Sequence, residues 1–369
     1  MYTYEVDNNG NILNASGNII TIKEFKNDGF GYKTETCEKE HYIKLIDIVQ
    51  MNGPLEKFSY YDDYINDMAE YERHTAVPVD ELLIPEGVTR ISCNFKEIKA
   101  RRIVIPEGVN VIEQSSFEED EYLESVVFPT SLQIIEEKAF MRCKNLSETN
   151  LKDLHNLDSI WKFAFRETAL TEVVIPDSVT YCGRGCFMKI PTLKRMIIGK
   201  GIDTIPPSFC DCIEMDPEDD FLTEVFIPET VKEVHTRAFS QARFSELKLP
   251  DGLEYIGSQA FSSCINLKQI LIPQKIKTIS EGTFWGCKNL NLLSLPHELE
   301  EIEKNSFNDC QTLNLFVIPP KVKYIEENVF EEFKPKIVII QSKEICRQIK
   351  KRGVLHFKED TTVKMITDI

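Results

Sequence analysis

The sequence predicts a repeat solenoid of the α/β type with a parallel β-sheet, and two observations lead to this prediction. Phenylalanine recurs at a nearly constant interval through most of the chain, and proline recurs at a nearly constant distance before it. The period is near 23 residues. A period of this length, repeated many times, is typical of solenoids, because each repeat covers the apolar side of its neighbour. The repeat therefore predicts an architecture, and it indicates no particular chemistry.

The phenylalanine near the end of each repeat marks the period. Successive phenylalanines are separated by 22, 23, 25, 22, 22, 30, 22, 23, 23 and 23 residues. They are Phe95, Phe117, Phe140, Phe165, Phe187, Phe209, Phe239, Phe261, Phe284, Phe307 and Phe330. Stacking of the repeats should line these side chains into a buried spine, which carries much of the stability.

Each repeat begins with a predicted strand that ends at a proline. In 170–176, inward apolar residues alternate with outward ones, as in a strand. Proline ends the strand because it has no N–H to donate. Leu154 and Gly199 replace the proline in two repeats, and a second apolar pair such as Ile276 and Ile279 follows before the phenylalanine.

Cysteine recurs three residues after the phenylalanine, at one position per repeat. These residues are Cys143, Cys212, Cys264, Cys287 and Cys310. A metal site needs ligands at close spacing, whereas these cysteines lie far apart along the solenoid. The pattern therefore favours buried thiols that pack in the core.

The complete phrase, clearest from Leu267 to Cys287, resembles the BspA-like (Treponema pallidum-type) leucine-rich repeat family. The resemblance covers about residues 80–357. It implies a leucine-rich repeat horseshoe or arc of about eleven repeats, with the sheet on its concave face. It also implies a ligand-binding or adhesive role, which members of this family commonly have at microbial surfaces.

The end of the chain fits the closing segment of that family. A strand is expected over 336–340, followed by a helix and then a strand over 354–357. Ser342 suits the N-cap of the helix, and Gly353 suits its C-terminus. We therefore expect a C-terminal cap and tail over 336–369, after a solenoid that spans 76–335.

Residues 1–75 precede the repeats and are expected to form a small α+β capping region, with a separate recognition module as the alternative. Segments 2–6 and 18–22 predict a hairpin. Phe58, Tyr61, Ile65 and Met68 follow helical spacing. Carboxylates accompany them at Asp62, Asp63, Asp67, Glu70 and Glu72.

Charge and composition exclude several classes of partner. A formal net charge of −17 argues against nucleic acid and against an anionic membrane surface, whereas a basic partner stays compatible with it. No apolar run is long enough for membrane insertion. The chain start does not read as a signal peptide and the 11 cysteines suggest reduced thiols, so a cytoplasmic location is expected. The family resemblance makes a cell-surface or secreted location the alternative.

The outward positions of the predicted strands hold the first candidate binding site. One outward column is polar for nine repeats and then becomes apolar, and the other is mostly apolar throughout. Strand propensity alone explains apolar residues on a sheet. The sharper hypothesis is an exposed apolar strip that binds a partner. It consists of Phe226, Leu271, Leu292, Leu315 and Val317.

The longest interval between phenylalanines contains an acidic insertion, the second candidate. Its carboxylates are Glu214, Asp216, Glu218, Asp219 and Asp220. They lack the spacing of a calcium loop, and a solvated loop is the simpler interpretation. The alternative is a loop that attracts a cation or a basic partner.

No catalytic motif accompanies the repeat. The 6 histidines show no ligand spacing, and Cys182 and Cys186 occupy inward positions of their repeat. We therefore predict a non-enzymatic scaffold without cofactor or metal, which holds a protein partner on the concave face. The alternative is a surface adhesin or receptor for host matrix or glycan. The sequence does not predict an oligomeric state.

Overall fold

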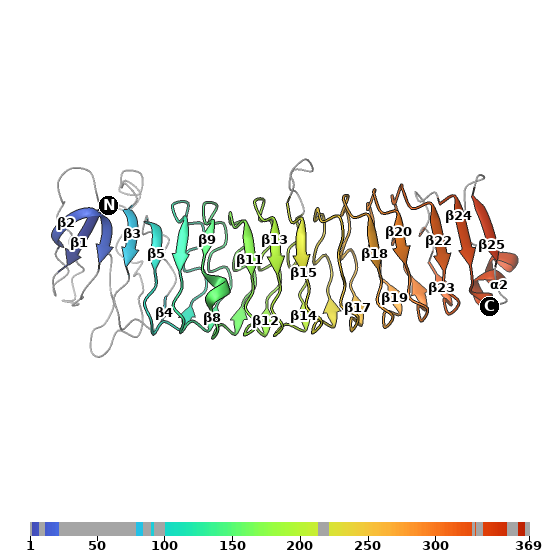
Figure 1. Ribbon diagram of the computed structural model, residues 1–369, viewed down its shortest axis with the longest axis horizontal. Helices are drawn as coiled ribbons and strands as arrows, with labels where there is room; N and C mark the ends of the chain where they lie inside the picture. Colours follow the sequence, from blue (N-terminus) through green and yellow to red (C-terminus); the bar gives the residue numbers. More distant parts are fainter. Residues whose placement is uncertain are drawn as a thin grey trace. The chain divides into compact units, whose positions relative to one another are not determined.

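The chain is a parallel β-solenoid with little helix, as the sequence predicts (Figure 1). The computed structural model describes residues 2–6, 12–21, 79–83, 90–91, 100–212, 221–326, 329, 335–352 and 361–365. Clustering of contacts divides the chain into two compact units, Met1–Thr171 and Glu172–Ile369. Both units are built of the same kind of coil.

Each coil has three parts, which we call the first strand, the second strand and the phenylalanine turn. The first strand precedes the proline position and buries its middle residue, as Ile270 does in the coil that begins at Leu267. The second strand has two residues and buries the latter, as with Ile279. The phenylalanine turn follows and buries its ring, as with Phe284.

In the first unit, the strands of successive coils pair in parallel. The first strands are β3 (Val79–Leu83), β5 (Ala100–Val104), β7 (Ser125–Val127) and β9 (Glu148–Thr149). The second strands are β4 (Arg90–Ile91), β6 (Val111–Ile112), β8 (Ile134–Ile135) and β10 (Ser159–Ile160). The hairpin predicted near the start is present, since β1 (Tyr2–Val6) pairs antiparallel with β2 (Ile12–Thr21). Strand β2 then pairs in parallel with β3, so the hairpin continues the sheet of first strands.

The second unit repeats this arrangement. Its first strands are β11 (Glu172–Val174), β13 (Arg195–Ile197), β15 (Glu224–Phe226), β18 (Gln269–Leu271), β20 (Leu292–Ser294), β22 (Leu315–Ile318), β24 (Ile337–Ile340) and β25 (Thr362–Met365). Its second strands are β12 (Tyr181–Cys182), β14 (Thr204–Ile205), β16 (Glu233–Val234), β17 (Tyr255–Ile256), β19 (Thr278–Ile279), β21 (Glu301–Ile302) and β23 (Tyr324–Ile325). The coil at 245–249 has no extended first strand, only a bridge from Glu246 to Gln269.

The buried phenylalanines stack, as the sequence predicts. In the first unit, the ring of Phe140 is 4.9 Å from that of Phe117 and 5.2 Å from that of Phe165, and all three are nearly parallel. In the second unit, Phe261 and Phe284 stack at 5.8 Å. Rings continue in the same way to Phe239 and Phe307, whereas Phe209 packs edge-on against both neighbours. Phe95 and Phe330 lie outside the described residues.

Alternate backbone N–H groups of the phenylalanine turns point toward the next coil. Gln259 and Ser263 lie on either side of Phe261 and have the left-handed φ values 58° and 56°. This alternation aims the N–H groups of all three residues at the next coil, where they bind the carbonyls of Glu281, Thr283 and Trp285. Gly282 and Gly286 hold the corresponding positions in that coil, with φ values of 61° and 73°. The turns therefore form a third ladder of backbone hydrogen bonds.

In two coils a residue other than proline follows the first strand, and the structural reason differs between them. In the coil with Leu154, a 3-10 helix (Leu151–Asp153) stands where a longer strand was expected. The side-chain amide of Asn150 accepts from the Phe128 N–H at 2.8 Å and donates to the Phe128 carbonyl at 2.9 Å, so it replaces backbone pairing. Gly199 approaches the preceding coil so closely that a Cβ would lie 2.2 Å from the carbonyl oxygen of Pro176.

The C-terminal cap consists of β24, α2 (Lys343–Arg352) and β25. Ser342 is the N-cap of α2, as predicted, because its Oγ accepts from the Ile345 N–H at 3.2 Å. It also donates to the Val322 carbonyl, which fixes the helix to the last coil. Gly353 and the strand expected over 354–357 lie outside the described residues, and the closing strand that the structure shows is Thr362–Met365.

Candidate functional site

The outward side chains of β11, β13 and β15 form a charged ladder. Arg195 binds Glu172 on one side and Glu224, at 3.2 Å, on the other. The hydrogen bond with Glu172, together with the nearby Glu224 carboxylate, raises the pKa of Arg195. The Arg195 guanidinium also lies 5.2 Å from the centre of the Phe226 ring. Arg195 is therefore paired within the chain, and the ladder of one arginine and two glutamates keeps a net charge of −1.

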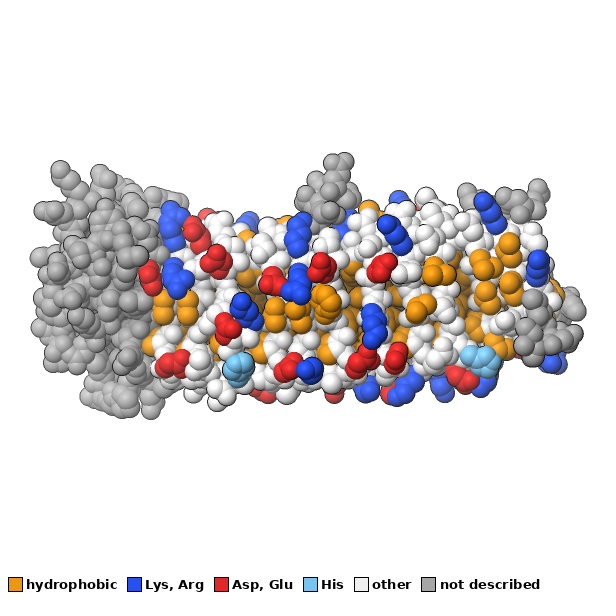
Figure 2. All heavy atoms as spheres, in the orientation of Figure 1, with side chains coloured by type: hydrophobic (Ala, Val, Ile, Leu, Met, Phe, Trp, Pro, Cys, Tyr) orange, Lys and Arg blue, Asp and Glu red, His pale blue; other side chains and the backbone are white. Residues whose placement is uncertain are grey.

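Beyond the coil at 245–249, the first strands carry exposed aliphatic side chains among their outward residues. We call four of them, one from each of β18, β20, β22 and β24, the aliphatic patch. They are Leu271 (66% exposed), Leu292 (52%), Leu315 (48%) and Ile337 (37%). Figure 2 shows hydrophobic side chains gathered over these strands, whereas both signs of charge lie over β11, β13 and β15. Contiguous apolar surface of this kind is rare on soluble proteins unless a partner covers it.

Strand register aligns Leu315 with Ile337, whereas Leu271 lies in the other outward column. Leu315 is paired with Ile337 and Val317 with Ile339 in the parallel ladder of β22 and β24. Gln269 is paired with Leu292, so Leu271 lies beside Ser294. Adjacent strands are about 4.8 Å apart, and the four patch residues come from four successive coils. The patch therefore crosses the strands rather than following one of them.

Each residue of the strip predicted from the sequence can now be placed. Leu271, Leu292 and Leu315 lie in the patch, and Val317 is half-buried beside it on β22. Phe226 is exposed on β15, but the coil at 245–249 separates it from β18 and carries Lys248 at the corresponding position. Lys248 binds Glu229 at 2.8 Å. Phe226 thus belongs with the charged ladder rather than with the patch.

Sequence reasoning missed Ile337 and the exposed Val363 and Met365 of β25. The outward columns were counted back from a proline, and no proline follows β24, where Gln341 stands instead. A signal was available, since 336–340 was itself expected to be a strand. The period alone would have placed Ile337 in the same column as Leu315.

Acidic residues are absent from the segments that carry the patch. Segments 171–177, 223–229 and 245–251 each carry two carboxylates, one in the strand and one after the proline. The corresponding later segments contain neither aspartate nor glutamate; they are 268–274, 291–297, 314–320, 336–341 and 361–365. The earlier segment 194–200 also has no carboxylate, but it is a single segment and it carries the paired Arg195.

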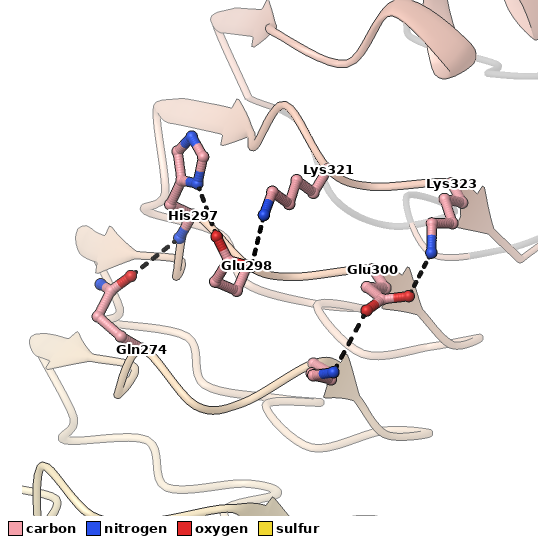
Figure 3. A network of polar contacts seen from close by, with 7 residues as sticks. Gln274, His297, Glu298, Glu300, Lys321 and Lys323 are labelled. Atoms are coloured by element: carbon pink, nitrogen blue, oxygen red, sulfur yellow. Dashed lines mark hydrogen bonds and ion pairs between the residues drawn. The ribbon is translucent and has the colours of Figure 1, made fainter.

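The side of the second strands has a different character. A shallow hollow of 730 Å³ is lined by His297, Glu298, Glu300, Pro320, Lys321, Val322, Lys323, Gln341, Lys343, Glu344 and Arg347. Figure 3 shows its polar network, in which Lys321 binds Glu298 at 2.6 Å and Lys323 binds Glu300. Hydrogen bonds from Lys321 and His297 lower the pKa of Glu298. Because lysine and glutamate neutralise each other here, this side offers less to a ligand than the patch does.

The cysteines of the coils are buried and unreactive. In the described part of the chain, all nine cysteines are free thiols. The Cys287 thiol donates to the Phe261 carbonyl at 3.2 Å, and Cys310 makes the same contact with Phe284. Burial raises the pKa of Cys287 to about 12, so it stays protonated at neutral pH. Cys182 and Cys186 are buried as predicted.

Neither a metal site nor a membrane span is found in the described ranges. No group of three histidine, cysteine or carboxylate side chains within them is placed to hold a metal ion. No helix among the same residues is long and apolar enough to cross a membrane. The acidic insertion, with Glu214, Asp216, Glu218, Asp219 and Asp220, lies outside the described residues and stays a prediction.

Comparison with known proteins gives one extended family match. The BspA type leucine rich repeat region matches residues 78–216 and 218–336, with six copies. No match is found among curated proteins.

Several solved structures are similar to the chain. A leucine-rich repeat protein from Bacteroides ovatus has 20% identity over 78% of this chain and 92% of its own, with a TM-score of 0.46. A leucine rich cell surface protein from Faecalibacterium prausnitzii has 20% identity over 97% of this chain and 96% of its own, with a TM-score of 0.48. A T. pallidum leucine rich repeat protein has 22% identity over 58% of this chain and 78% of its own, with a TM-score of 0.31.

Proposed function

The chain belongs to the BspA type leucine rich repeat family, and we propose that it is a non-enzymatic scaffold that binds a protein partner through the aliphatic patch. One observation carries the proposal: four exposed aliphatic side chains lie on four successive first strands. Burying such a surface stabilises a complex, because each apolar side chain removed from water contributes about 1.5–3 kcal/mol when fully covered.

The chemistry of the patch favours a protein over a small molecule. The patch is a row of side chains on a sheet, whereas a small-molecule site is a concavity that encloses its ligand. A row of aliphatic groups with few polar groups supplies contact area and little directional recognition, which suits another apolar surface. The Lys–Glu network on the side of the second strands is already internally paired, so it does not compete with the patch as the principal site.

Replacing two patch residues tests the proposal. The double substitution Leu292→Lys with Leu315→Lys should abolish capture of the partner in a pull-down from native lysate. Both side chains are about half exposed, so the melting temperature should stay unchanged.

The matched control lies in the same coil as Leu315. Tyr324 on β23 is 49% exposed, against 48% for Leu315, and it lies on the side of the second strands. Tyr324→Lys should leave capture intact. A partner that binds the leucine variant as well as it binds the unchanged chain would refute the proposed site.

A further inference from the structure

The last first strand, β25, is an edge of its sheet. The sheet has the order β22, β24, β25, and no other strand among the described residues pairs with β25 (Figure 1). The Thr362 N–H donates to the Lys336 carbonyl at 2.9 Å, so the backbone groups of Thr362 and Lys364 face β24. The backbone groups of Val363 and Met365 alternate with these and therefore point away from β24.

The inward layer is uncovered at the same strand. Register places Val363 beside Val338 and Met365 beside Ile340. Val338 and Ile340 are fully buried, whereas Val363 is 38% exposed and Met365 is 41% exposed. Two apolar columns that are covered on β24 are therefore in contact with water on β25.

The helix α2 covers this end of the solenoid on the side of the second strands. The Gln348 Nε2 group donates to the Lys323 carbonyl at 3.0 Å, and Ser342 donates to the Val322 carbonyl. The side chains of β25 stay exposed beside this cap. A strand with backbone groups directed away from its sheet, next to exposed inward apolar side chains, is a surface to which another strand can add.

A second β25 fits this edge in one register. Antiparallel pairing about a two-fold axis normal to the sheet keeps the inward side chains of both copies on the same face. Val363 can then lie opposite Val363 of the second copy, with Thr361 opposite Met365 on either side. Every member of these pairs has its backbone groups directed at the other copy, so the pairs make about six hydrogen bonds.

The neighbouring register is less favourable. It sets Val363 opposite Met365 and makes about four hydrogen bonds within the described residues. It also places Lys364 directly opposite Lys364 of the second copy, and like charges at such positions destabilise a pair of strands. In the first register Lys364 lies opposite Thr362 instead. Hydrogen bonding and charge therefore select the same register.

We propose that two copies of this chain form a dimer through antiparallel pairing of their β25 strands, with Val363 at the two-fold axis. The contact is isologous, so it closes at two copies. It goes beyond the proposed function, since it uses the edge of the sheet and leaves the aliphatic patch uncovered. The dimer places the two patches on one continuous sheet face, with the two Ile337 strands three spacings, about 14 Å, apart.

The mass of the full chain in solution tests the pairing. In sedimentation equilibrium under reducing conditions, the average mass should rise from one copy toward two as concentration increases. Val363→Pro should weaken dimerisation at least about tenfold, because proline has no N–H to donate across the axis. That N–H does not face β24, so the melting temperature should stay unchanged. The matched control is Leu292→Lys with Leu315→Lys, which should dimerise as the unchanged chain does.

Cysteine cross-linking tests the register with two variants of the same strand. Val363→Cys should give a disulfide-linked dimer in oxidised glutathione, because residues opposite each other in a hydrogen-bonded pair have Cα atoms about 5.5 Å apart. Lys364→Cys should link no more than the unchanged chain. Its counterpart lies diagonally across the axis at about 8 Å, which is too far for a disulfide. Mass spectrometry of the linked peptides identifies the bond.

Three results would overturn the inference. The first is a monomer at every concentration up to about 0.3 mM, where a dissociation constant of about 1 mM would already be visible. The second is a dimer that Val363→Pro does not weaken, and the third is cross-linking of Lys364→Cys in place of Val363→Cys. If Val363→Pro also lowers the melting temperature, the cross-link decides. The proposed function is tested separately by capture from lysate, so either can fail while the other stands.

Discussion

Two stretches of first strands, β11 to β15 and β18 to β24, share an inward layer and differ in their outward layer. Val173 and Met196 are buried in the first stretch as Ile270 and Phe316 are in the second. Outward, the first stretch carries a ladder of opposite charges that bind one another, and the second carries the aliphatic patch. The outward side chains of the first stretch bind one another, whereas those of the aliphatic patch are exposed.

The boundary between the two stretches is the coil at 245–249. Its first-strand segment makes a single bridge, from Glu246, and its outward Lys248 is engaged by Glu229. This coil is the last whose first-strand segment carries carboxylates. The inward layer continues through it, since Leu247 and Leu249 are buried. The outward side chains therefore change from charged to aliphatic at this coil, while the inward layer stays the same.

Substitutions in the inward layer should cause the largest loss of stability, and the loss should be the same for both stretches. Phe187 and Phe284, in the coils of β11 and β18, are fully buried. Replacing either with alanine should lower the free energy of unfolding by about 3–5 kcal/mol, because transfer free energy is lost and a cavity remains. Urea unfolding measures both. If one substitution lowers the free energy of unfolding by less than half as much as the other, the two stretches do not share an equivalent core.

High pH should weaken the chain through its buried thiols, in the first stretch at Cys186 and Cys212 as well as in the second. Cys264, in the coil at 245–249, and Cys287 and Cys310, in the second stretch, each lie three residues after a buried phenylalanine. Burial raises the pKa of Cys287 from the ordinary 9.0 to about 12, and it raises that of the other two as well. A folded pKa above the unfolded value means that stability is full below pH 9 and decreases as pH rises toward 12.

Urea midpoints between pH 8 and pH 11 test this, with Cys287→Ala as the control. Lysines and tyrosines also titrate in this range, so the informative quantity is the difference between the two proteins. The variant should be less stable at pH 8, because the Phe261 carbonyl loses its thiol donor. The difference in urea midpoint between the unchanged chain and the variant should become smaller as pH rises. A constant difference would indicate that the thiol is not held protonated.

The inward layer was predictable from the sequence because its period is regular. Buried phenylalanines, second-strand residues such as Ile279 and the N-cap Ser342 follow from spacing and residue type alone. Contacts between coils were not predictable in this way. The pairing of Asn150 with the backbone of Phe128 and that of Cys287 with the Phe261 carbonyl depend on distances between coils that a single repeat does not specify.

The candidate site was predictable only in part, for a related reason. Column counting found Leu271, Leu292 and Leu315, but it also joined Phe226 to them. The separation of Phe226 depends on its cation–π contact with Arg195 and on Lys248 in the intervening coil. Which lysines form ion pairs within the described residues could not be predicted from the sequence, since pairing with a carboxylate 21 to 23 residues away is a property of coil stacking.

The smallest effect on stability should come from the charged ladder itself. Arg195→Met removes both ion pairs and the contact with Phe226. The melting temperature should change little, because exposed ion pairs contribute little to stability and salt screens them. Differential scanning calorimetry at low and high salt measures this change, and the variant should differ less from the unchanged chain at high salt. A large, salt-independent loss would show that the outward layer of the first stretch supports the fold, and the contrast with the aliphatic patch would then fail. A small loss instead leaves both outward layers free to vary, so that one can carry paired charges while the other stays exposed.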